Sequence, residues 1–329
     1  MHAPRTCVIL VNYRGASDTA ACVRSLLASA CEAVLVVVDS TPDDPGLEPA
    51  LAFAPGIQLI RAPENLGFGG ANNLGIAWAL RNTECEFFFL LNNDTTVRPD
   101  TIALLIAACE RDPGIGIAVP RIAYMHDPGR LWYGGGEIDW RRASAVAPGF
   151  NGSANAPLAM TERDVTFATG CALFLRRAAL AQLKGFDPRF FMYEEDCELC
   201  LRASECGIRI RYIPSAFILH RAQGSNRQSA HLRTDFWSTA NPRLPFLCYH
   251  VIRNRLLNIS LHARGKNLGL VAGFFPLFLI RRAVPFLIHG RCDAIVAMAR
   301  GVADFVLERY CKSKTRIPVA AYGQTKMPG

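Results

Sequence analysis

The chain has 329 residues, of which 50% are hydrophobic and 19% are charged. This composition is typical of a globular protein and excludes an intrinsically disordered one, and the length allows one large domain or a domain with an appendage. The formal net charge of +8 is unevenly distributed, since residues 1–220 carry a net charge of −5 and residues 221–329 a net charge of +13. The basic C-terminal third therefore needs an anionic partner, for which nucleic acid and an anionic membrane surface are the usual candidates.

The twelve cysteines are interpreted as reduced thiols rather than as disulfides. Residues 1–6 lead directly into a short apolar segment, without the basic region and apolar stretch of a secretory signal, and disulfides are rare in proteins that are not exported. Cys197-x-x-Cys200, with Cys206 nearby, has no second Cys or His pair at zinc-site spacing. A zinc site is therefore not predicted.

The first 120 residues alternate between short apolar runs, typical of strands, and segments with helical spacing. The predicted strands are 7–11, 33–38, 57–60, 87–91 and 115–119, and the predicted helices are 17–30, 69–81 and 100–111. The apolar runs have no polar face, which indicates a parallel sheet covered by helices. Ligands bind beyond the carboxyl ends of the strands in such sheets. The residues that follow the predicted strands are polar and include Asn12, Asp39, Asn65 and Asn92 to Asp94.

The middle of the chain is less regular. Residues 125–163 are rich in Gly, Pro, Ala and Asn, and we predict a long excursion or mobile loop there, of the kind that often serves as a lid. Regular structure is expected again over residues 165–177, and a helix over residues 195–207. A short apolar strand is expected over residues 216–219, directly before His220.

The C-terminal segment combines apolar runs with arginines. Residues 268–280 and 283–288 are apolar, and Arg281 and Arg282 separate them. The longer run is too short to cross a bilayer alone. If the two arginines extend toward lipid headgroups, the runs lie in the membrane interface or form a re-entrant pair; the alternative is a buried helical hairpin in a soluble protein. We favour contact with the membrane surface, because apolar and cationic residues coincide here.

Several common catalytic and binding motifs are absent from the sequence. In Gly67-Phe68-Gly69-Gly70, the only near match to G-x-G-x-x-G, Asn72 stands where the last glycine is required, so a dinucleotide oxidoreductase is not supported. Neither G-x-S-x-G nor H-E-x-x-H occurs. The basic third lacks interleaved stacking aromatic residues, so no nucleic-acid partner is predicted.

Three groups of polar residues are candidates for chemistry. Asn92-Asn93-Asp94 is either an ordinary turn, in which Asn and Asp are favoured, or a site for a divalent metal and a diphosphate. Four carboxylates lie within residues 194–198; packing like charges raises at least one pKa, which suits a general base, although carboxylates also stabilise a helix N-terminus. His220 follows a strand as Asp94 does, so the two are candidates for one metal, while a lone histidine is more often structural.

The motifs occur in a recognisable order. They comprise residues 8–13, 36–40, 65–75, 90–94, 170–172, 185–191, 195–196 and 220. The most specific are Asn65-Leu66-Gly67-Phe68-Gly69-Gly70-Ala71-Asn72-Asn73 and the segment from Phe190 to Asp196. In this order the chain resembles glycosyltransferase family 2, and within it the bacterial rhamnosyltransferase-like branch, over roughly residues 6–260. The resemblance implies an α/β fold of the GT-A type with a mostly parallel central sheet, and an inverting transfer of a sugar from a nucleotide donor.

The resemblance also implies roles for individual residues. Asp196 matches the catalytic base, with Glu195 beside it, and Asp94 matches the metal-binding aspartate of the D-x-D motif, so that Mg²⁺ or Mn²⁺ would rest on Asp94, the diphosphate and His220. Asn92 replaces the first aspartate of that motif. The residues expected against the donor nucleotide are Asn12, Asp39, Asn65, Gly67, Asn72 and Asn92, with Asp39 on the base.

One turn departs from the family pattern. Residues 39–43 read Asp-Ser-Thr-Pro-Asp, where the family commonly has Asp-Asn-Gly-Ser. The contacts that this turn makes in the family are therefore not transferred to this chain.

The resemblance finally implies a cellular role. We expect a GT-A domain over residues 1–240 and a basic, apolar, helical, membrane-associating extension over residues 241–329, in a cytoplasmic protein that is peripheral on the inner face of the cytoplasmic membrane. The expected donor is dTDP-L-rhamnose and the expected acceptor a polysaccharide or a polyprenyl-diphosphate-linked sugar in cell-surface glycan synthesis. The alternatives are a UDP-sugar donor and a non-catalytic peripheral membrane protein. The linkage and the oligomeric state stay open.

Overall fold

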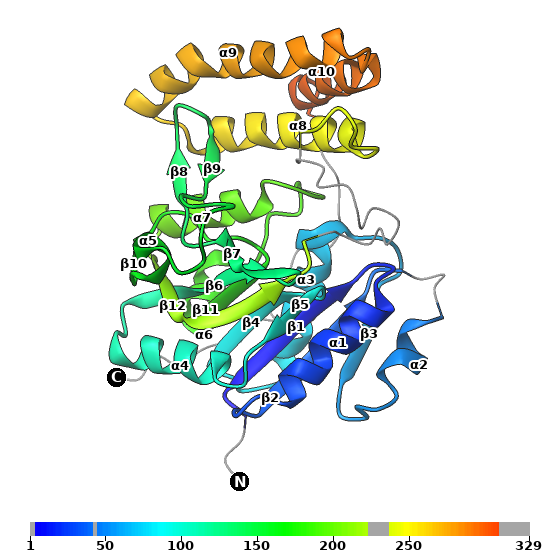
Figure 1. Ribbon diagram of the computed structural model, residues 1–329, viewed down its shortest axis with the longest axis vertical. Coiled ribbons are helices and arrows are strands. Elements are labelled where there is room, and N and C mark those ends of the chain that lie inside the picture. Colours follow the sequence, from blue (N-terminus) through cyan, green and yellow to red (C-terminus); the bar gives the residue numbers. More distant parts are fainter. Residues whose placement is uncertain (1–3, 42–44, 223–236, 309–329) are drawn as a thin grey trace.

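The computed structural model describes residues 4–41, 45–222 and 237–308. Its centre is a ten-stranded sheet with helices packed on it, and three further helices form a separate layer above (Figure 1). The strand order along the main path of the sheet is β10-β12-β6-β11-β4-β1-β2-β3. Residues 42–44, which include part of the atypical turn after Asp39, lie outside the described residues.

The first half of the sheet is parallel. Its strands are β1 (Thr6–Asn12), β2 (Ala33–Asp39), β3 (Gln58–Arg61) and β4 (Phe87–Asn92), and the helices between them are α1 (Ala16–Leu27), α2 (Leu47–Leu51) and α3 (Gly67–Asn82). The apolar runs of β1, β2 and β4 are almost fully buried because helices cover both faces of the sheet. The carboxyl ends of β1, β2 and β4 therefore lie at one edge.

The second half of the sheet is mixed. β11 (Ala172–Arg176) runs antiparallel between β4 and β6 (Ile115–Tyr124), and β6 pairs in parallel with β12 (Arg209–His220). The strands β5 (Thr95–Val97), β7 (Asp127–Tyr133) and β10 (Arg163–Val165) add antiparallel pairs. The helices of this half are α4 (Thr101–Arg111), α6 (Arg177–Leu183) and α7 (Glu195–Glu205).

The predicted elements of the first 120 residues are confirmed, with boundaries that shift by a few residues, but the prediction of a loop over 125–163 is wrong. This segment forms β7, the hairpin β8 (Glu137–Asp139) and β9 (Ser144–Val146), and the short helix α5 (Pro157–Met160). Leu131 and Tyr133 are buried, and the Tyr133 hydroxyl donates to the carbonyl of Phe167 at 2.5 Å. Gly136 is required because a Cβ there would lie 2.5 Å from the Phe167 ring. The glycines thus serve close packing rather than mobility.

The upper layer consists of α8 (Leu244–His262), α9 (Lys266–Ile288) and α10 (Cys292–Val306). α8 and α10 pack closely, because Gly301 lets α10 approach the backbone of α8: a Cβ there would lie 2.7 Å from the Tyr249 carbonyl oxygen. Apolar residues of all three helices form a core separate from that of the sheet, made of Leu244, Leu247, Cys248, Val251, Ile252, Phe286, Ala294, Ala297 and Met298.

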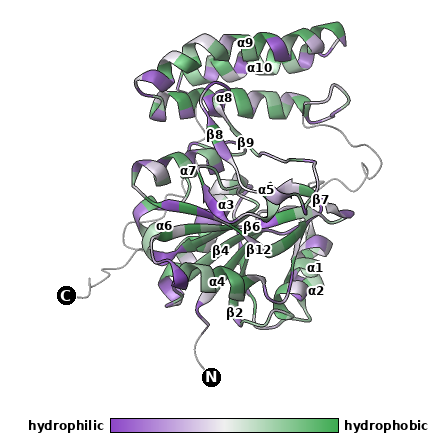
Figure 2. Cartoon of the chain, turned by 60° about the vertical axis from the view of Figure 1, so that its left-hand side comes forward, coloured by the Kyte–Doolittle hydropathy of each residue, from purple (hydrophilic) through white to green (hydrophobic). Residues whose placement is uncertain are grey.

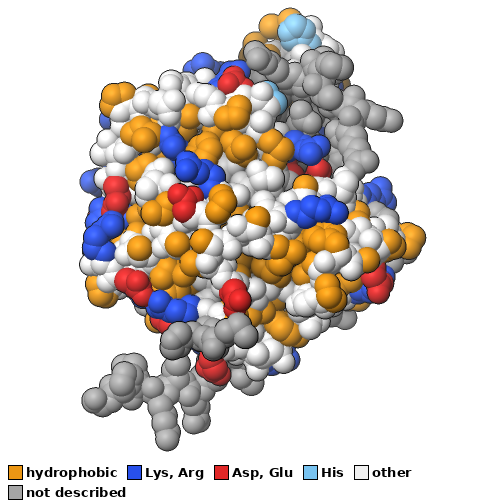
Figure 3. Space-filling view, turned by 60° about the horizontal axis from the view of Figure 1, so that its bottom comes forward, with side chains coloured by type: hydrophobic (Ala, Val, Ile, Leu, Met, Phe, Trp, Pro, Cys, Tyr) orange, Lys and Arg blue, Asp and Glu red, His pale blue; other side chains and the backbone are white. Residues whose placement is uncertain are grey.

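The helix α9 corrects the expectation for the C-terminal apolar runs. The two runs and the arginine pair between them form one helix of 23 residues rather than a re-entrant pair or a buried hairpin. Pro276 and Pro285 lie within this helix. Only 17% of its most apolar 18-residue window is buried, and by length and composition the helix could cross a membrane. Figure 2 shows its hydrophobic residues along the upper edge of the molecule. The opposite end carries acidic and basic side chains among hydrophobic ones (Figure 3).

Candidate active site

The carboxyl ends of β1 and β2 hold a buried polar pair. Asn12 and Asp39 are register partners, and Nδ2 of Asn12 donates to Oδ1 of Asp39 at 3.0 Å. The other end of the Asn12 amide accepts hydrogen bonds from the Gly15 N–H at 3.2 Å and the Thr19 hydroxyl at 2.9 Å. The Asp39 carboxylate also accepts from the N–H of Thr41. Asn12 therefore fixes the orientation of the Asp39 carboxylate, because hydrogen bonds at both ends hold the Asn12 amide in place.

The turn after β4 joins this pair through Thr19. Nδ2 of Asn93 donates to the Thr19 hydroxyl at 2.9 Å. Gly15 makes room for this contact, because a Cβ there would lie 2.8 Å from Nδ2 of Asn93. Asn92 is held through its backbone, whose N–H donates to the carbonyl of Cys171 at 2.8 Å. The segment 92–94 is thus a tightly packed turn whose position depends on α1 and on the segment before β11.

Asp94 lies against His220. The antiparallel pairing of β5 with β12 aligns Thr95 with His220 and brings Oδ1 of Asp94 to 3.1 Å from Nε2 of His220. The ring of Trp132 packs edge-on against the imidazole with a centroid distance of 4.4 Å. Burial by itself lowers the pKa of His220, but Cys171 and Asp94 outweigh it and raise that pKa to about 10. Burial raises the pKa of Asp94, and His220 more than offsets this, so the pKa is lowered.

This pair fits a metal only in part. An aspartate oxygen and an imidazole nitrogen are suitable ligands for a divalent ion, and Nδ1 of His220 is buried without a hydrogen-bond partner. Within residues 4–41, 45–222 and 237–308, no group of three or more His, Cys, Asp or Glu side chains is arranged to hold a metal. Cys197 and Cys200 are buried free thiols. A metal at Asp94 would therefore need oxygen ligands from a bound substrate.

The glycine-rich segment before α3 packs against the turn that precedes α7. Oδ1 of Asn65 accepts the N–H of Gly67 at 3.0 Å, and Nδ2 of Asn72 donates to the Phe68 carbonyl. Gly67 has a φ of +69°, and a Cβ there would lie 2.0 Å from the Phe191 carbonyl oxygen. That same carbonyl accepts the N–H of Phe68 at 3.0 Å. Only glycine is compatible with this conformation and this approach.

A reciprocal amide contact makes the same connection. Nδ2 of Asn73 donates to the Phe186 carbonyl at 2.8 Å, and Oδ1 of Asn73 accepts the Phe186 N–H at 2.9 Å. Asn73 is almost fully buried. The expected nucleotide loop and the acidic segment are therefore one packed unit.

The four carboxylates of residues 194–198 separate into two kinds. Glu198 forms an ion pair with Arg202 at 2.6 Å, and Glu194 forms one with Arg255 of α8 at 2.5 Å. The side chains of Glu194, Glu198 and Arg255 are more than 90% buried, whereas that of Arg202 is 24% exposed. These two glutamates are neutralised by arginines and have a structural explanation. The remaining two, Glu195 and Asp196, have no arginine partner among the described residues.

Asp196 has the properties of a general base. Burial raises its pKa to about 6, although hydrogen bonds from the N–H groups of Gly170 at 2.9 Å and Cys197 at 2.8 Å limit the rise. Burial, followed by the charge of Asp196, raises the pKa of Glu195 well above its usual range. Oε2 of Glu195 is buried without a hydrogen-bond partner. A carboxylate with a pKa near 6 is ionised at neutral pH and still accepts a proton readily.

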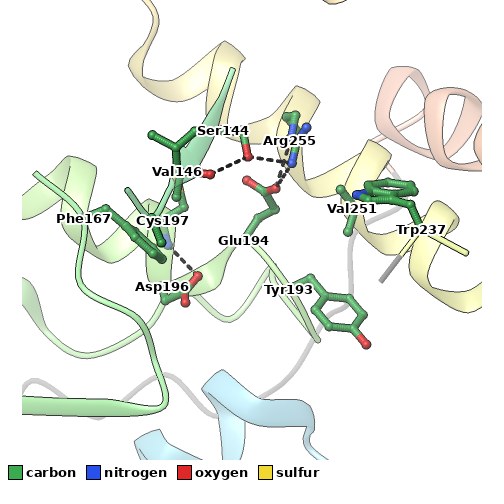
Figure 4. Close-up of a pocket in the computed structure, with 12 residues that line it drawn as sticks. Ser144, Val146, Phe167, Tyr193, Glu194, Asp196, Cys197, Trp237, Val251 and Arg255 are labelled. Atoms are coloured by element: carbon green, nitrogen blue, oxygen red, sulfur yellow. Dashed lines mark hydrogen bonds and ion pairs between the residues drawn. The ribbon is translucent and has the colours of Figure 1, made fainter. Parts of the chain in front are cut away.

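A cavity of about 320 Å³ opens beside Asp196 (Figure 4). Its walls come from the β8–β9 hairpin, the turn before α7, and α8. The lining residues are Ser144, Ala145, Val146, Ala147, Phe167, Tyr193, Glu194, Asp196, Cys197, Trp237, Val251 and Arg255. The cavity is large enough for a small ligand and has a mostly apolar wall with a few polar groups, as ligand sites commonly do.

The comparisons with known proteins agree with this geometry. Residues 4–237 match the model of the family described as "Glycosyltransferase like family 2". The chain belongs to this family. It is therefore a glycosyltransferase, as the resemblance implied.

The glycosyltransferase has curated relatives of modest identity. It is 29% identical over 229 residues to the N-acetylglucosaminyl-diphospho-decaprenol L-rhamnosyltransferase of Mycobacterium tuberculosis, covering 62% of this chain and 72% of the relative. It is 26% identical over 196 residues to the rhamnosyltransferase WbbL of Escherichia coli K12, covering 54% and 72%. These similarities support the rhamnosyltransferase-like branch of the family.

A solved structure supports the fold. The mannosyltransferase PcManGT from Pyrobaculum calidifontis, in complex with GDP-Man and Mn²⁺, aligns with a TM-score of 0.54 over 98% of this chain and 85% of its own. The sequence identity is 16%, so the likeness concerns the fold alone. The expected GT-A architecture with a central sheet and a C-terminal helix that could associate with a membrane is confirmed.

The predicted site residues are joined by short hydrogen-bonded connections. Thr19 links the Asn12–Asp39 pair to Asn93. The segment Gly170–Cys171 links Asp196 to Asn92, because the Gly170 N–H bonds Asp196 and the Cys171 carbonyl bonds Asn92. The roles of these residues toward a donor, a metal and an acceptor stay predictions.

Two residues of the candidate site, Thr19 and Arg255, were not predicted from the sequence. Thr19 lies in a helix, where a threonine carries no signal of a role at a site. Arg255 lies in the segment that was interpreted as a membrane-associating extension, and yet it lines the same cavity as Asp196. Four carboxylates in five positions were a usable signal for Arg255, since buried charges need partners.

Proposed function

We propose that this glycosyltransferase moves L-rhamnose from dTDP-L-rhamnose onto a polyprenyl-diphosphate-linked sugar in the synthesis of a cell-surface glycan. The names of the two relatives support the sugar, and that of the mycobacterial relative supports a lipid-linked acceptor. The observation that carries the chemistry is the half-buried Asp196, whose pKa is raised to about 6 and which lines a cavity.

The acceptor sugar occupies the cavity between the β8–β9 hairpin and α8, with one hydroxyl directed at Asp196. The carboxylate takes the proton of that hydroxyl while the hydroxyl oxygen attacks the anomeric carbon of the donor. The bond from that carbon to the diphosphate oxygen breaks in the same step, and dTDP leaves. A single in-line displacement inverts the configuration at that carbon. The N–H groups of Gly170 and Cys197 fix the orientation of the carboxylate during this step.

The donor nucleotide lies along the carboxyl edge of the parallel strands. Asp39, oriented by Asn12, contacts the base, and the segment Asn65 to Asn72, with its sharp turn at Gly67, contacts the nucleotide together with Asn92. Asp94 and His220 would hold a divalent metal, Mg²⁺ or Mn²⁺, together with oxygen ligands of the donor diphosphate, and its charge would offset that of the leaving diphosphate. The mannosyltransferase of the same fold was solved with Mn²⁺, which supports a divalent metal in general but not these ligands.

We also propose that the molecule works at a membrane, with the transferase unit over residues 1–240 and the membrane-associating extension over residues 241–329. The exposed apolar surface of α9 and the net charge of +13 over residues 221–329 support it. Both features favour the anionic, cytoplasmic side of a bilayer. A peripheral position on that side gives access to a lipid-linked acceptor.

The experiment is a donor screen with the full chain. Purified protein is incubated with Mg²⁺ or Mn²⁺, a polyprenyl-diphosphate-linked N-acetylglucosamine and one of several dTDP-, UDP- or GDP-sugars, and the products are analysed by mass spectrometry and NMR. We expect transfer from dTDP-L-rhamnose with inversion. Transfer from a UDP-sugar instead would replace the donor, and a product with retained configuration would refute the single displacement.

A further inference from the structure

The helix α8 buries polar residues on the face that contacts the catalytic unit. Asn254, Asn258 and His262 recur at intervals of four and therefore lie on one side of the helix. All three are buried, as are the neighbouring Arg253 and Arg255. Burying amide and guanidinium groups is costly unless they are hydrogen-bonded, so their partners indicate what this face is for.

The two asparagines bond to three consecutive carbonyl groups. Nδ2 of Asn254 donates to the carbonyl of Met192 at 2.9 Å and to that of Tyr193 at 2.7 Å. Nδ2 of Asn258 donates to the carbonyl of Glu194 at 3.1 Å. Every carbonyl of the turn that leads into α7 thus has a side-chain donor from α8.

This turn has an unfavourable backbone conformation. Tyr193 and Glu194 have φ values of +67° and +69°, in the left-handed region that side chains with a Cβ avoid. Two such residues in succession persist only where the surroundings hold them. The next two residues are Glu195 and Asp196, the first of α7. The turn therefore determines where α7 begins and where the Asp196 carboxylate lies.

The third contact is electrostatic. Arg255 donates from Nη2 and Nε to Oε1 of Glu194, at 2.5 and 3.1 Å, and from Nη2 to the Ser144 hydroxyl at 2.9 Å. Figure 4 shows Arg255 and Glu194 pointing at each other in the wall of the cavity that Asp196 also lines. The guanidinium therefore ties the turn, α8 and β9 together and balances the charge next to Asp196.

We propose that Asn254, Arg255 and Asn258 are positioning residues for the transfer: α8 holds the left-handed turn 192–194 and thereby places the Asp196 carboxylate against the acceptor hydroxyl. This inference rests on the proposed function, because it takes Asp196 as the base. It assigns α8 to the catalytic machinery, although α8 lies in the extension after residue 240. The membrane-associating part of the extension is then α9 with α10.

The test compares kcat, the KM for the donor and nucleotide-induced thermal stabilisation in the full chain. We expect Asn254→Ala and Asn258→Ala to lower kcat by about 100-fold, the usual effect of displacing a catalytic group by about 1 Å, while the donor KM and the stabilisation by dTDP with Mn²⁺ stay within about twofold of wild type. Ser260→Ala, on the exposed side of the same helix, is the matched control and keeps wild-type kcat.

The arginine provides a second measurement that does not depend on the asparagine variants folding. Arg255→Met loses the charge and the hydrogen bonds, whereas Arg255→Lys keeps the charge and can still donate from its single nitrogen, so we expect lysine to recover about tenfold in kcat over methionine. Equal losses in both variants, or a kcat near wild type in Arg255→Met, would overturn the inference. If the wild-type chain transfers no sugar, the proposed function itself has failed, which is a different result.

Discussion

The neighbouring helices α8 and α9 use their surfaces in opposite ways. α8 buries polar and charged side chains, among them Arg253, Asn254 and Arg255. α9 exposes apolar ones, with Leu287 and Ile288 at 65% and 74% exposure. A buried polar face needs a protein partner with matching hydrogen-bonding groups, whereas a large exposed apolar face needs a partner less polar than water.

The difference assigns different partners to the two helices. The asparagines on the polar face of α8 donate to the turn before α7, so a partner for this face is already present in the fold. The outer face of α9 contacts no other part of the described chain, and arginines lie along the same helix, of which Arg281 is exposed. We therefore propose that the C-terminal segment combines one helix that positions the site with another that contacts a membrane.

The largest expected effect concerns the group that α8 holds in place. Asp196→Asn removes the base without changing the size of the side chain, and we expect kcat to fall by about 10²–10⁴-fold with donor binding nearly unchanged. The measurement is a single-turnover assay together with calorimetry of nucleotide binding. Asp139→Asn in β8, outside the cavity lining, is the matched control. Retention of most activity in Asp196→Asn would show that another group takes the proton.

The next effect concerns the edge of the sheet at Asp94. Asp94→Ala removes a proposed metal ligand, and we expect donor-nucleotide affinity in Mn²⁺ to fall by about 10–100-fold. Chelation of the metal should reduce wild type to the affinity of the variant. Asp127→Ala, an exposed aspartate at the start of β7, is the control. Equal affinities of wild type and Asp94→Ala, with and without metal, would remove Asp94 from the metal site.

The pH dependence of kcat/KM tests the environment that the turn creates for Asp196. Because the pKa of Asp196 is raised to about 6, its basic form is lost as the pH falls through that value, and kcat/KM should drop by about tenfold per pH unit below it. The effect is measured in a series of buffers at constant ionic strength. The residual activity of Asp196→Asn should lack this limb. An acidic limb near pH 4, the ordinary value of an aspartate, would contradict the raised pKa.

The smallest effect on catalysis is expected for α9. The double change Leu277→Asp and Leu287→Asp introduces charge on two side chains that are 59% and 65% exposed, and we expect the fraction bound to anionic vesicles to fall by about tenfold with unchanged kcat on a water-soluble acceptor. Leu27→Asp in α1, at 55% exposure, is the matched control. Unchanged vesicle binding of the double variant would show that the outer face of α9 does not contact lipid.

Much of the fold could be predicted from local pattern. The runs of β1, β2 and β4 are apolar on both faces, and a strand can bury both faces only inside a covered sheet. The polar residues at their ends were therefore predicted to share an edge, and Asn12 and Asp39 do contact each other there. Residues 125–163 were predicted wrongly because glycine-rich sequence is typical of loops, whereas the glycines here, such as Gly136, allow close packing.

Part of the site could be predicted and part could not. The acidic run near residue 196 signalled unusual chemistry, but its division into paired and unpaired carboxylates depends on Arg202 and Arg255, which lie 4 and 61 residues from their glutamates. The pairing with Arg202 follows from helical spacing. The pairing with Arg255 has no local signal, because it requires α8 to fold back onto the turn.

The sequence by itself determined the strands, the polar edge beyond them, the order of the family motifs and the apolar character of residues 268–288, because each of these follows from residue type and spacing along a short stretch of chain. Only the tertiary structure decided that the turn at Tyr193 and Glu194 is left-handed, and that α8 supplies the donors that hold it. The physical reason is that hydrogen bonds and ion pairs between distant segments depend on chain packing, which no local pattern encodes.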